Sequence, residues 1–239
     1  MKPQLSVVIP AYNESALINE VLTNVMASLG ANGITNEIII VDDSSKDNTV
    51  EKVKQYMADH PSQTIHLIES KPNRGKGFAI RQGIQKASGE FLIIQDADHE
   101  YDPREYPRLL APLVEDKADV VYGSRFAGGN PHRILFFWHS IGNKFLTFVS
   151  NAFTNLNLTD METGYKVFRT PIIQQLKLRE NRFGIEPEMT AKISRIRNIR
   201  IYEIGISYYG RTYDEGKKIN WKDGFRAIWC VLKYNLWAR

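Results

Sequence analysis

The sequence predicts an α/β fold, in which a doubly wound, mainly parallel sheet carries helices on both faces and amphipathic helices follow toward the C-terminus. Two observations predict it. Short apolar runs of strand length alternate with segments of about 10 to 15 residues that have helical periodicity. Polar clusters directly follow several of the apolar runs, at the places where strands would end. No repeat or linker interrupts this order, so we expect one domain over residues 1–239, with halves 1–125 and 126–239.

The first elements follow from hydrophobic pattern. Ser6–Ile9 is a short apolar run that we expect to stop at Pro10, which has no amide hydrogen to donate. Ala16–Leu29 places its leucines and valines on one helical face. Glu37–Val41 is apolar almost throughout, as is typical of a strand covered on both faces. The same alternation continues with a helix from Asp47 or Asn48 to Tyr56, a strand over Thr64–Glu69, a helix over Gly75–Ala87, a strand over Phe91–Ile94, a helix from Pro103 to Glu115 and a strand over Asp119–Tyr122.

Two amphipathic segments dominate the second half. Ile134–Phe153 carries large apolar side chains on one stripe and polar ones, such as Asn143, on the other, and Asp223–Trp237 repeats the pattern. One interpretation is that these helices lie in a membrane interface, and the alternative is that their apolar stripes face the protein core. The last segment is also a candidate for contact between copies of the chain in a homo-oligomer.

Composition limits the classes of protein. A hydrophobic content of 43% and a charged content of 24% are ordinary for a folded chain. The single cysteine, Cys230, excludes an internal disulfide and suits a reducing compartment. We see no apolar secretory signal and no run of about 18 to 20 apolar residues, which a spanning helix needs. We therefore expect a cytoplasmic protein that contacts membranes only peripherally, on their cytoplasmic face.

The charge is unevenly distributed along the chain. Residues 1–120 contain 12 Lys and Arg against 18 Asp and Glu, whereas residues 121–239 contain 19 against 9. This favours an acidic half that holds a cation and a basic half that meets phosphate or anionic lipid, although a solvated basic face explains the same numbers. No recognition motif for nucleic acid accompanies the basic charge, so we expect no nucleic-acid partner.

The pair Asp96 and Asp98, separated by Ala97, directly follows the strand Phe91–Ile94. Two carboxylates this close repel each other, and a divalent cation relieves the repulsion. Hard oxygen ligands select Mg²⁺ or Mn²⁺, with open positions left for substrate phosphates. The alternative is a solvated turn, or a cap for the helix that begins at Pro103.

Six segments occur in an order and spacing that resemble a known family. They are SVVIPAYNE, IIIVDDSSKDNT, RGKGFAIRQG, DADHEYDP, YGSRF and DMETGYKVFR. Together they resemble the family 2 inverting glycosyltransferases of the GT-A fold, and more narrowly the polyprenyl-phosphate (dolichyl-phosphate mannose or glucose synthase-like) branch, over Leu5–Lys218. The resemblance implies metal-dependent, inverting transfer of a hexose from a GDP- or UDP-sugar to a polyprenyl phosphate at a membrane surface. It assigns the nucleotide sugar to residues 1–125, and the acceptor and the membrane to residues 126–239.

The resemblance also implies site residues. Those expected at the nucleotide sugar are Pro10, Tyr12, Glu14, Asp42, Asp43, Lys76, Asp96, Ala97 and Asp98. Asp96 and Asp98 would also hold the metal. The glycines of the RGKG loop would allow the nucleotide to approach closely, or would serve tight packing of the following helix.

The expected catalytic residues are Asp98, Arg125, Arg211, Lys217, Lys218 and Glu188. Guanidinium groups bind phosphate oxygens through two hydrogen bonds, and either lysine supplies a mobile charge.

The acceptor decides whether a base is needed. A saccharide hydroxyl needs a carboxylate base, for which Glu186, Glu188, Asp160 and Glu162 are the candidates. A polyprenyl phosphate is already an anion and needs none. The chain has Glu-Pro-Glu where saccharide-transferring relatives typically have Glu-Asp, which favours the lipid phosphate. A saccharide acceptor in cell-envelope or glycan assembly, and a nucleotide- or anion-binding scaffold without catalysis, are the alternatives.

Overall fold

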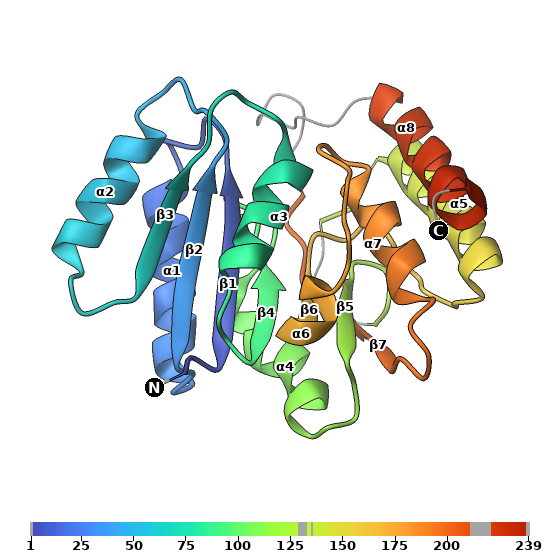
Figure 1. Ribbon diagram of the computed structural model, residues 1–239, viewed down its shortest axis with the longest axis horizontal. Coiled ribbons are helices and arrows are strands. Elements are labelled where there is room, and N and C mark those ends of the chain that lie inside the picture. The colour runs from blue at the N-terminus through green and yellow to red at the C-terminus, as the bar shows by residue number, and fades with distance from the viewer. Residues whose placement is uncertain (1, 129–132, 135, 211–220, 238–239) are drawn as a thin grey trace.

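A seven-stranded mixed sheet forms the centre of the molecule (Figure 1). The computed structural model describes residues 2–128, 133–134, 136–210 and 221–237. The strand order is β3-β2-β1-β4-β6-β5-β7, and β6 alone runs antiparallel to its neighbours among these strands. The strands are β1 (Leu5–Ala11), β2 (Asn36–Asp42), β3 (Ile65–Glu69), β4 (Phe91–Ile94), β5 (Val120–Ser124), β6 (Lys166–Arg169) and β7 (Ile201–Gly205). The predicted α/β architecture with a mainly parallel sheet is confirmed.

Helices cover both faces of this sheet. On one face α1, α2 and α4 pack over one apolar cluster, and on the other α3, α6 and α7 pack over a second. The helices are α1 (Ile18–Ala31), α2 (Thr49–Asp59), α3 (Lys76–Lys86), α4 (Tyr106–Val114), α5 (Phe137–Thr154), α6 (Thr170–Gln174), α7 (Ile185–Ile193) and α8 (Trp221–Leu232), with a 3₁₀ turn η1 (Pro103–Glu105) and a π-helical turn η2 (Lys233–Trp237). The alternating apolar side chains of each strand supply both clusters, as a sheet buried on both faces requires.

The first strand is longer than predicted. β1 continues through Pro10 to Ala11 and pairs with β2 over its whole length. Its pairing with β4 ends at Val8, whose carbonyl accepts a hydrogen bond from the Gln95 amide. Backbone groups alternate in direction along a strand, so those of Pro10 point to the same side as those of Val8. On that side β4 has already ended, so no neighbouring strand loses a hydrogen bond because proline has no amide hydrogen.

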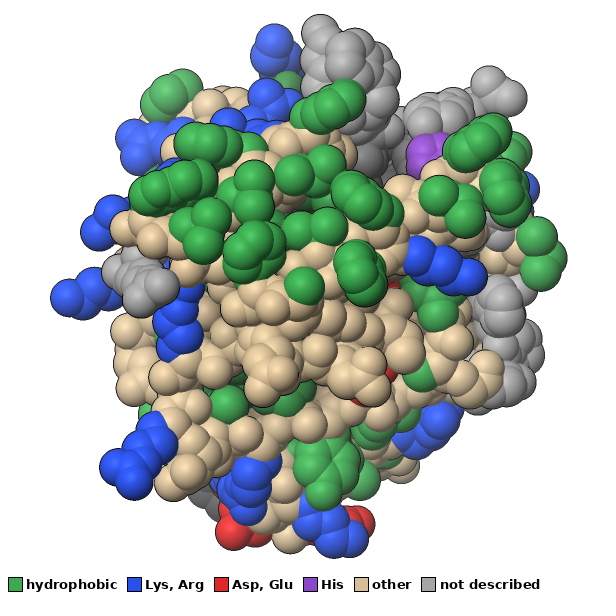
Figure 2. Space-filling view, turned by 90° about the vertical axis from the view of Figure 1, so that its right-hand side faces the viewer, with side chains coloured by type: hydrophobic (Ala, Val, Ile, Leu, Met, Phe, Trp, Pro, Cys, Tyr) green, Lys and Arg blue, Asp and Glu red, His purple; other side chains and the backbone are tan. Residues whose placement is uncertain are grey.

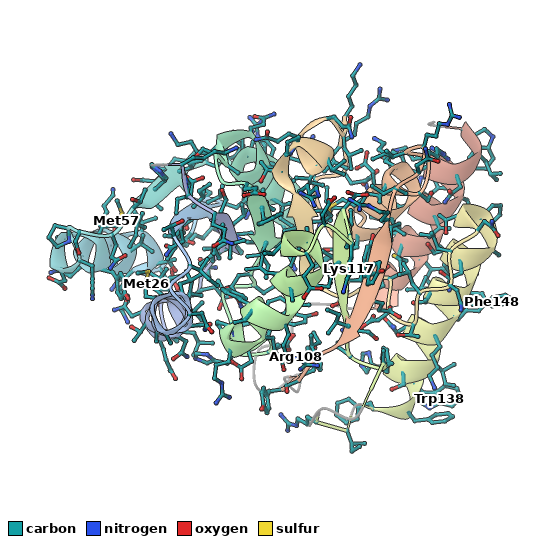
Figure 3. The ribbon with its side chains drawn as sticks, turned by 90° about the horizontal axis from the view of Figure 1, so that it is seen from below. Met26, Met57, Arg108, Lys117, Trp138 and Phe148 are labelled. Carbon is teal, nitrogen blue, oxygen red and sulfur yellow. The ribbon has the colours of Figure 1, made fainter. Side chains whose placement is uncertain are left out.

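The two amphipathic segments of the second half form α5 and α8, which pack against each other and lie at the edge of the molecule. In α5 the apolar stripe faces outward: Trp138 is 79% and Phe148 is 69% exposed, whereas Thr147 and Ser150 are buried. Figure 3 shows Trp138 and Phe148 pointing away from the domain. The alternative interpretation, in which this stripe faces the core, is therefore wrong for α5.

The apolar face of α5 continues onto α8. We call this surface the apolar face, and Figure 2 shows its green side chains gathered together, with Lys and Arg side chains around them. Its members are Phe137, Trp138, Ile141, Phe145, Phe148, Phe225, Trp229, Leu236 and Trp237. No helix in the described ranges is both long enough and apolar enough to cross a bilayer.

Candidate active site

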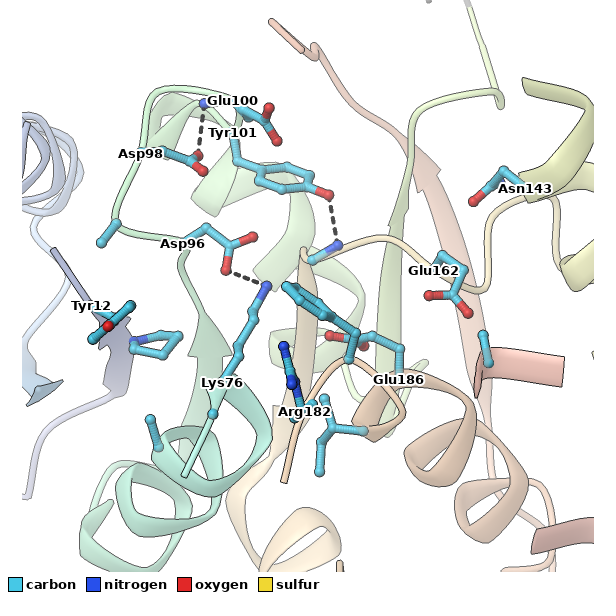
Figure 4. A pocket seen from close by; sticks show the side chains of 18 of the residues that line it. Tyr12, Lys76, Asp96, Asp98, Glu100, Tyr101, Asn143, Glu162, Arg182 and Glu186 are labelled. Carbon is cyan, nitrogen blue, oxygen red and sulfur yellow. Dashed lines mark hydrogen bonds and ion pairs between the residues drawn. The ribbon is translucent and has the colours of Figure 1, made fainter. Parts of the chain in front are cut away.

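A cavity of about 970 Å³ opens at the carboxyl ends of the parallel strands. Loops after β1, β2, β4 and β5 line it, together with the start of α3, the segment before β6, the start of α7, and parts of α5 and α8. It lies where the chain order reverses between β1 and β4, the position at which open α/β sheets bind ligands. Strand direction therefore brings the polar clusters seen in the sequence to one edge (Figure 4).

Asp96 and Asp98 stand on the loop after β4, and both line the cavity. The Lys76 ammonium group lies 2.5 Å from Asp96 Oδ1. Burial disfavours the charged amine, but Asp96, with Glu186 and Asp98 farther away, raises the pKa of Lys76 above its ordinary value. Asp98 is largely buried, and its Oδ1 accepts a hydrogen bond from the Glu100 amide at 3.0 Å. A cation already neutralises Asp96 in this arrangement.

Buried side chains hold the Asp96–Asp98 loop in place. Gln95 is fully buried, and its Oε1 accepts hydrogen bonds from Tyr106 and Tyr165 at 2.7 and 2.5 Å. Its Nε2 donates to the carbonyl of Asp96. A Cβ at Gly164 would lie 2.8 Å from Asp96 Oδ2, so only glycine lets this segment approach the carboxylate so closely. The geometry of the aspartate pair is therefore set by the core beneath it.

Asp43 organises the glycine loop that begins α3. Its carboxylate accepts hydrogen bonds from the amides of Arg74 (2.9 Å) and Gly75 (2.5 Å). Gly75 has φ of +104°, and a Cβ there would lie 2.6 Å from the carbonyl oxygen of Asn181. The contacts of Gly75 thus show tight packing at the start of helix α3, and Gly75 also lines the cavity.

The other predicted nucleotide-sugar residues divide into two groups. Pro10, Tyr12 and Glu14 line the cavity with Asp43, Lys76 and the Asp96–Asp98 loop. Asp42 does not line it, and its Oδ2 accepts a hydrogen bond from the Ser45 amide. One oxygen of Asp42 therefore holds the turn after β2, and the other, Oδ1, is buried without a hydrogen-bond partner among the described residues.

Arg125 lines the cavity while a fully buried carboxylate holds it. Its Nε and one terminal nitrogen each lie 2.7 Å from an oxygen of Asp160, and the same terminal nitrogen donates to Asn143 Oδ1 at 3.1 Å. Burial opposes the charge, but Asp160 keeps the pKa of Arg125 well above its ordinary range, and Arg125 lowers the pKa of Asp160. The guanidinium group is thus a fixed positive charge at the cavity wall.

Glu188 lies apart from the other predicted catalytic residues. Its carboxylate is fully buried and does not line the cavity. It accepts hydrogen bonds from the amides of Arg179 and Glu180 and pairs with Lys192 at 2.5 Å. Glu186, two residues earlier on α7, lines the cavity instead and is paired with the buried ammonium group of Lys166. Positions two apart point to different sides of a helix, so only one of these glutamates reaches the cavity.

Glu162 contributes another carboxyl group to the cavity wall. It lines the cavity on the segment before β6, and its Oε1 is buried without a hydrogen-bond partner among the described residues. Burial, and next the charge of Glu186, raise the pKa of Glu162 to about 7. Figure 4 shows it between Glu186 and Asn143 in that view. Glu162 therefore differs from Asp160 and Glu186, which both have cationic partners.

The remaining basic candidates, Arg211, Lys217 and Lys218, lie outside the described residues. Within the described part of the chain, no three His, Cys, Asp or Glu side chains are grouped so that they could hold a metal ion by themselves. Asp96 and Asp98 fit a cation that takes most of its ligands from substrate phosphates and water, as Mg²⁺ usually does.

The sequence did not single out several other residues that line the cavity. Tyr101 accepts a hydrogen bond from the Gly164 amide and stacks on Tyr165, while Arg182 comes from the loop before α7. Trp138 was predicted only as a member of the apolar stripe of Ile134–Phe153, and it lines the cavity together with Gly142 and other α5 residues. Periodicity did not predict that these residues meet in one cavity, because the loops and helices that bring them together are far apart in sequence.

The same cavity reaches the apolar face. Trp138 belongs to both, and Gly142 and Leu146 of α5 line the cavity together with Gly224 and Ala227 of α8. A ligand in the cavity would thus meet carboxylates and Lys76 at one end and an exposed aromatic surface at the other.

Comparison of the sequence with known proteins identifies the family to which the chain belongs. The model of the family described as "Glycosyl transferase family 2" matches residues 6–177. A dolichol-phosphate mannosyltransferase of Pyrococcus furiosus is 26% identical over 234 residues, which are 97% of this chain and 64% of that protein. A dodecaprenyl-phosphate galacturonate synthase of Rhizobium johnstonii is 25% identical over 90% of this chain and 61% of its own length. The chain therefore spans less than two thirds of these two relatives.

Another relative matches over nearly its full length. It is a UDP-N-acetylglucosamine–dolichyl-phosphate N-acetylglucosaminyltransferase of Methanococcus voltae, 26% identical over 94% of this chain and 93% of its own. Among solved structures, glucosyl-3-phosphoglycerate synthase from Mycobacterium tuberculosis, in complex with Mn²⁺, UDP and phosphoglyceric acid, superposes with a TM-score of 0.73. It is 18% identical, and the match covers 98% of this chain and 79% of that one, which confirms the predicted fold.

Proposed function

The chain belongs to glycosyl transferase family 2 and is a glycosyltransferase, and on this premise we propose that it transfers a hexose, with inversion, from a nucleotide sugar to a polyprenyl phosphate at a membrane surface. One observation carries the proposal: a single cavity joins the Asp96–Asp98 pair to the outward-facing aromatic surface of α5 and α8. A lipid phosphate has the matching chemistry, with an anionic head and an apolar chain.

The donor is assigned to the end of the cavity near β1. Pro10, Tyr12 and Glu14 would hold the nucleotide, and Asp43 would act through the glycine loop whose backbone it binds. Neighbours of the same fold support this assignment, because one of them is described with UDP and a divalent metal.

Asp96 and Asp98 would hold the divalent cation, Mg²⁺ or Mn²⁺, that neutralises the leaving diphosphate. The contact between Lys76 and Asp96 supports this, since a positive charge already occupies one side of the pair. When donor binds, Lys76 is free to exchange Asp96 for a phosphate oxygen, because both are anionic oxygen acceptors.

The acceptor phosphate is assigned to the region of Arg125. Its oxygen attacks the anomeric carbon opposite the diphosphate, a new carbon–oxygen bond forms, and the bond to the diphosphate breaks with its electron pair. Arg125, fixed by Asp160, would attract the incoming anion. No carboxylate base is needed, which agrees with Glu186 being paired and Glu188 lying outside the cavity.

Membrane contact follows from α5 and α8. An outward aromatic face flanked by basic side chains is the pattern of helices that lie in a lipid interface. The names of relatives that act on dolichyl or dodecaprenyl phosphates support an acceptor in that interface. We assign the protein to the cytoplasmic face, since nucleotide sugars are made in the cytoplasm.

One observation favours the alternative of a saccharide acceptor. Glu162 has a buried oxygen without a partner and a pKa of about 7, which suits a general base. This alternative predicts turnover with saccharides and none that depends on lipid phosphate.

A donor-by-acceptor screen tests the proposal. The purified chain with Mg²⁺ or Mn²⁺ is given UDP-glucose, UDP-galactose, UDP-N-acetylglucosamine or GDP-mannose, with or without a short polyprenyl phosphate in detergent. We expect release of nucleoside diphosphate from one donor only when the lipid phosphate is present, with an inverted anomeric configuration in the product. Release that requires a saccharide instead would overturn the lipid-phosphate assignment.

A further inference from the structure

Glu162 is a carboxyl group of the cavity wall that the proposed mechanism does not use, and within the described part of the chain it lacks the cationic partner that Glu186 has. Asp160 is paired with Arg125, and Glu186 is paired with Lys166. The buried Oε1 of Glu162 has no partner among the described residues. Because a buried polar atom without a hydrogen bond is costly, such an atom in a ligand cavity indicates a group that a ligand supplies.

The position of Glu162 narrows which part of the substrates can reach it. It stands two residues before Gly164, where an added Cβ would lie 2.8 Å from Asp96 Oδ2. The wall that carries Glu162 therefore begins at the proposed site of the donor diphosphate and runs toward Asn143 and α5. In the proposed function the transferred sugar lies between these two ends.

The charges around Glu162 limit the kind of ligand group that can bind to its Oε1. Burial, and next the charge of Glu186, raise the pKa of Glu162, whereas Lys166 and Arg125, which are paired with Glu186 and Asp160, lower it. A second anion at Oε1 would be repelled by the ionised form of Glu162 itself, whose Oε1 has no partner among the described residues. A neutral group that donates a hydrogen bond suits it, and among the two substrates such groups are the hydroxyls of the sugar.

We propose that the Glu162 carboxyl group binds a hydroxyl of the transferred sugar and thereby selects neutral hexoses over hexuronates. The inference rests on the proposed function, because it requires a nucleotide sugar in this cavity. It makes Glu162 a specificity-determining residue, since a site built to bind a hydroxyl strongly rejects a ligand that lacks it.

Binding measurements without acceptor isolate this role. Dissociation constants in Mg²⁺ are measured for UDP and GDP, for the four donors named above and for UDP-glucuronate. They are compared for the wild type, Glu162→Leu, Glu162→Gln and the exposed control Glu115→Leu. Leucine removes the polar group, whereas glutamine keeps the shape and the ability to accept and donate hydrogen bonds. Circular dichroism checks that each variant is folded.

We expect Glu162→Leu to leave the affinity for the nucleoside diphosphate within about twofold and to weaken binding of the preferred nucleotide sugar at least tenfold. Glu162→Gln should stay within about threefold of the wild type with neutral donors and should narrow the discrimination against UDP-glucuronate. The control variant should behave as the wild type. A deoxy donor that lacks the bound hydroxyl should bind the wild type and Glu162→Leu equally weakly.

Two results overturn the inference: the first leaves the proposed function intact, and the second favours the saccharide acceptor. In one, Glu162→Leu prefers the nucleotide sugar over the nucleoside diphosphate as strongly as the wild type does. In the other, Glu162→Gln binds donor normally but loses more than 100-fold in kcat, which identifies a general base. If the wild type binds none of the donors, the proposed function itself fails and the inference fails with it.

Discussion

At the scale of single residues, the site is defined by which charges have partners. Asp160 and Glu186 are compensated by Arg125 and Lys166, and Asp96 is paired with the ammonium group of Lys76. Buried pairs of this kind hold side chains in place, and removing one partner leaves an uncompensated charge. The groups that remain able to bind a ligand are therefore Lys76, the Asp96–Asp98 pair and Glu162.

Replacing Asp98 with asparagine should lower turnover at least 100-fold and leave the fold intact. Asparagine keeps the oxygen that accepts the Glu100 amide hydrogen, but it removes the negative charge that the cation needs. Steady-state kinetics over a Mn²⁺ titration and a thermal melt measure both effects. The exposed residue Asp59 offers a matched control, since Asp59→Asn should change neither. Turnover close to wild type in Asp98→Asn would remove Asp98 from the proposed metal site.

The Glu162→Gln variant should be stabilised relative to the wild type as pH rises. The folded state raises the pKa of Glu162 from 4.5 to about 7, so folded protein binds this proton more tightly than unfolded protein does. The wild type therefore loses stability between about pH 4.5 and 7, by at most about 3 kcal/mol at ~1.4 kcal/mol per pKa unit. Above pH 7 the difference should stay constant.

Urea unfolding of both proteins at pH 5, 6, 7 and 8 measures this difference, and comparing the two proteins cancels the titration of all other groups. A free-energy difference that does not change between pH 5 and 7 would show that Glu162 titrates normally in the folded state.

At the scale of secondary-structure elements, α5 inverts the usual arrangement of an amphipathic helix. Its small polar side chains, such as Thr147 and Ser150, pack inward, and its aromatic side chains face out. Glu180 ties the neighbouring α8 and η2 to the domain through Arg226, Lys233 and Tyr234. The two helices are therefore held as a fixed platform, and their exposed apolar side chains are left for a ligand or a membrane.

Removing two aromatic side chains from this platform should weaken membrane binding selectively. Phe145 and Phe148 are exposed on α5 and do not line the cavity. The double variant Phe145→Ser/Phe148→Ser should bind vesicles of phosphatidylcholine and phosphatidylglycerol at least tenfold more weakly in sedimentation assays, because apolar burial drives interfacial binding. Turnover with a water-soluble, short-chain prenyl phosphate should stay within about threefold.

Val114 supplies the control for that measurement. It is exposed on α4, away from the apolar face, so Val114→Ser should bind vesicles as the wild type does. Equal vesicle binding by the wild type and the double variant would show that this surface does not meet the membrane.

At the scale of the whole molecule, the two halves of the chain share one sheet. β5, from the end of the first half, is flanked by β6 and β7 from the second, and β6 also pairs with β4. The cavity likewise takes residues from both halves. We propose that residues 1–125 and 126–239 form one folding unit and not two independent domains.

A fragment of residues 1–125 should therefore fail to fold cooperatively. It leaves β5 without either neighbouring strand and exposes the edge of β4, which favours aggregation. We expect the full chain to unfold in one calorimetric transition and the fragment to show none. A fragment with a cooperative melt and a native-like circular dichroism spectrum would establish an independent first domain.

The sequence by itself determined the order and type of the early elements. Apolar runs placed β4 at Phe91–Ile94 and β2 within one residue at each end. The clusters at Tyr12, Asp43 and Asp96 could be predicted to meet, because parallel strands bring their carboxyl ends to one edge. These features depend on local pattern and chain direction, which a sequence carries in full.

Only the tertiary structure decided which helix faces are exposed and which charged side chains reach the cavity. Periodicity shows that α5 has two faces but not which is outward, and it does not separate Glu186, which lines the cavity, from Glu188, which does not. The short antiparallel strand β6 and the unpartnered oxygen of Glu162 also escaped prediction. The physical reason is that orientation and charge compensation depend on contacts between residues that are distant in sequence, and local pattern carries no record of them.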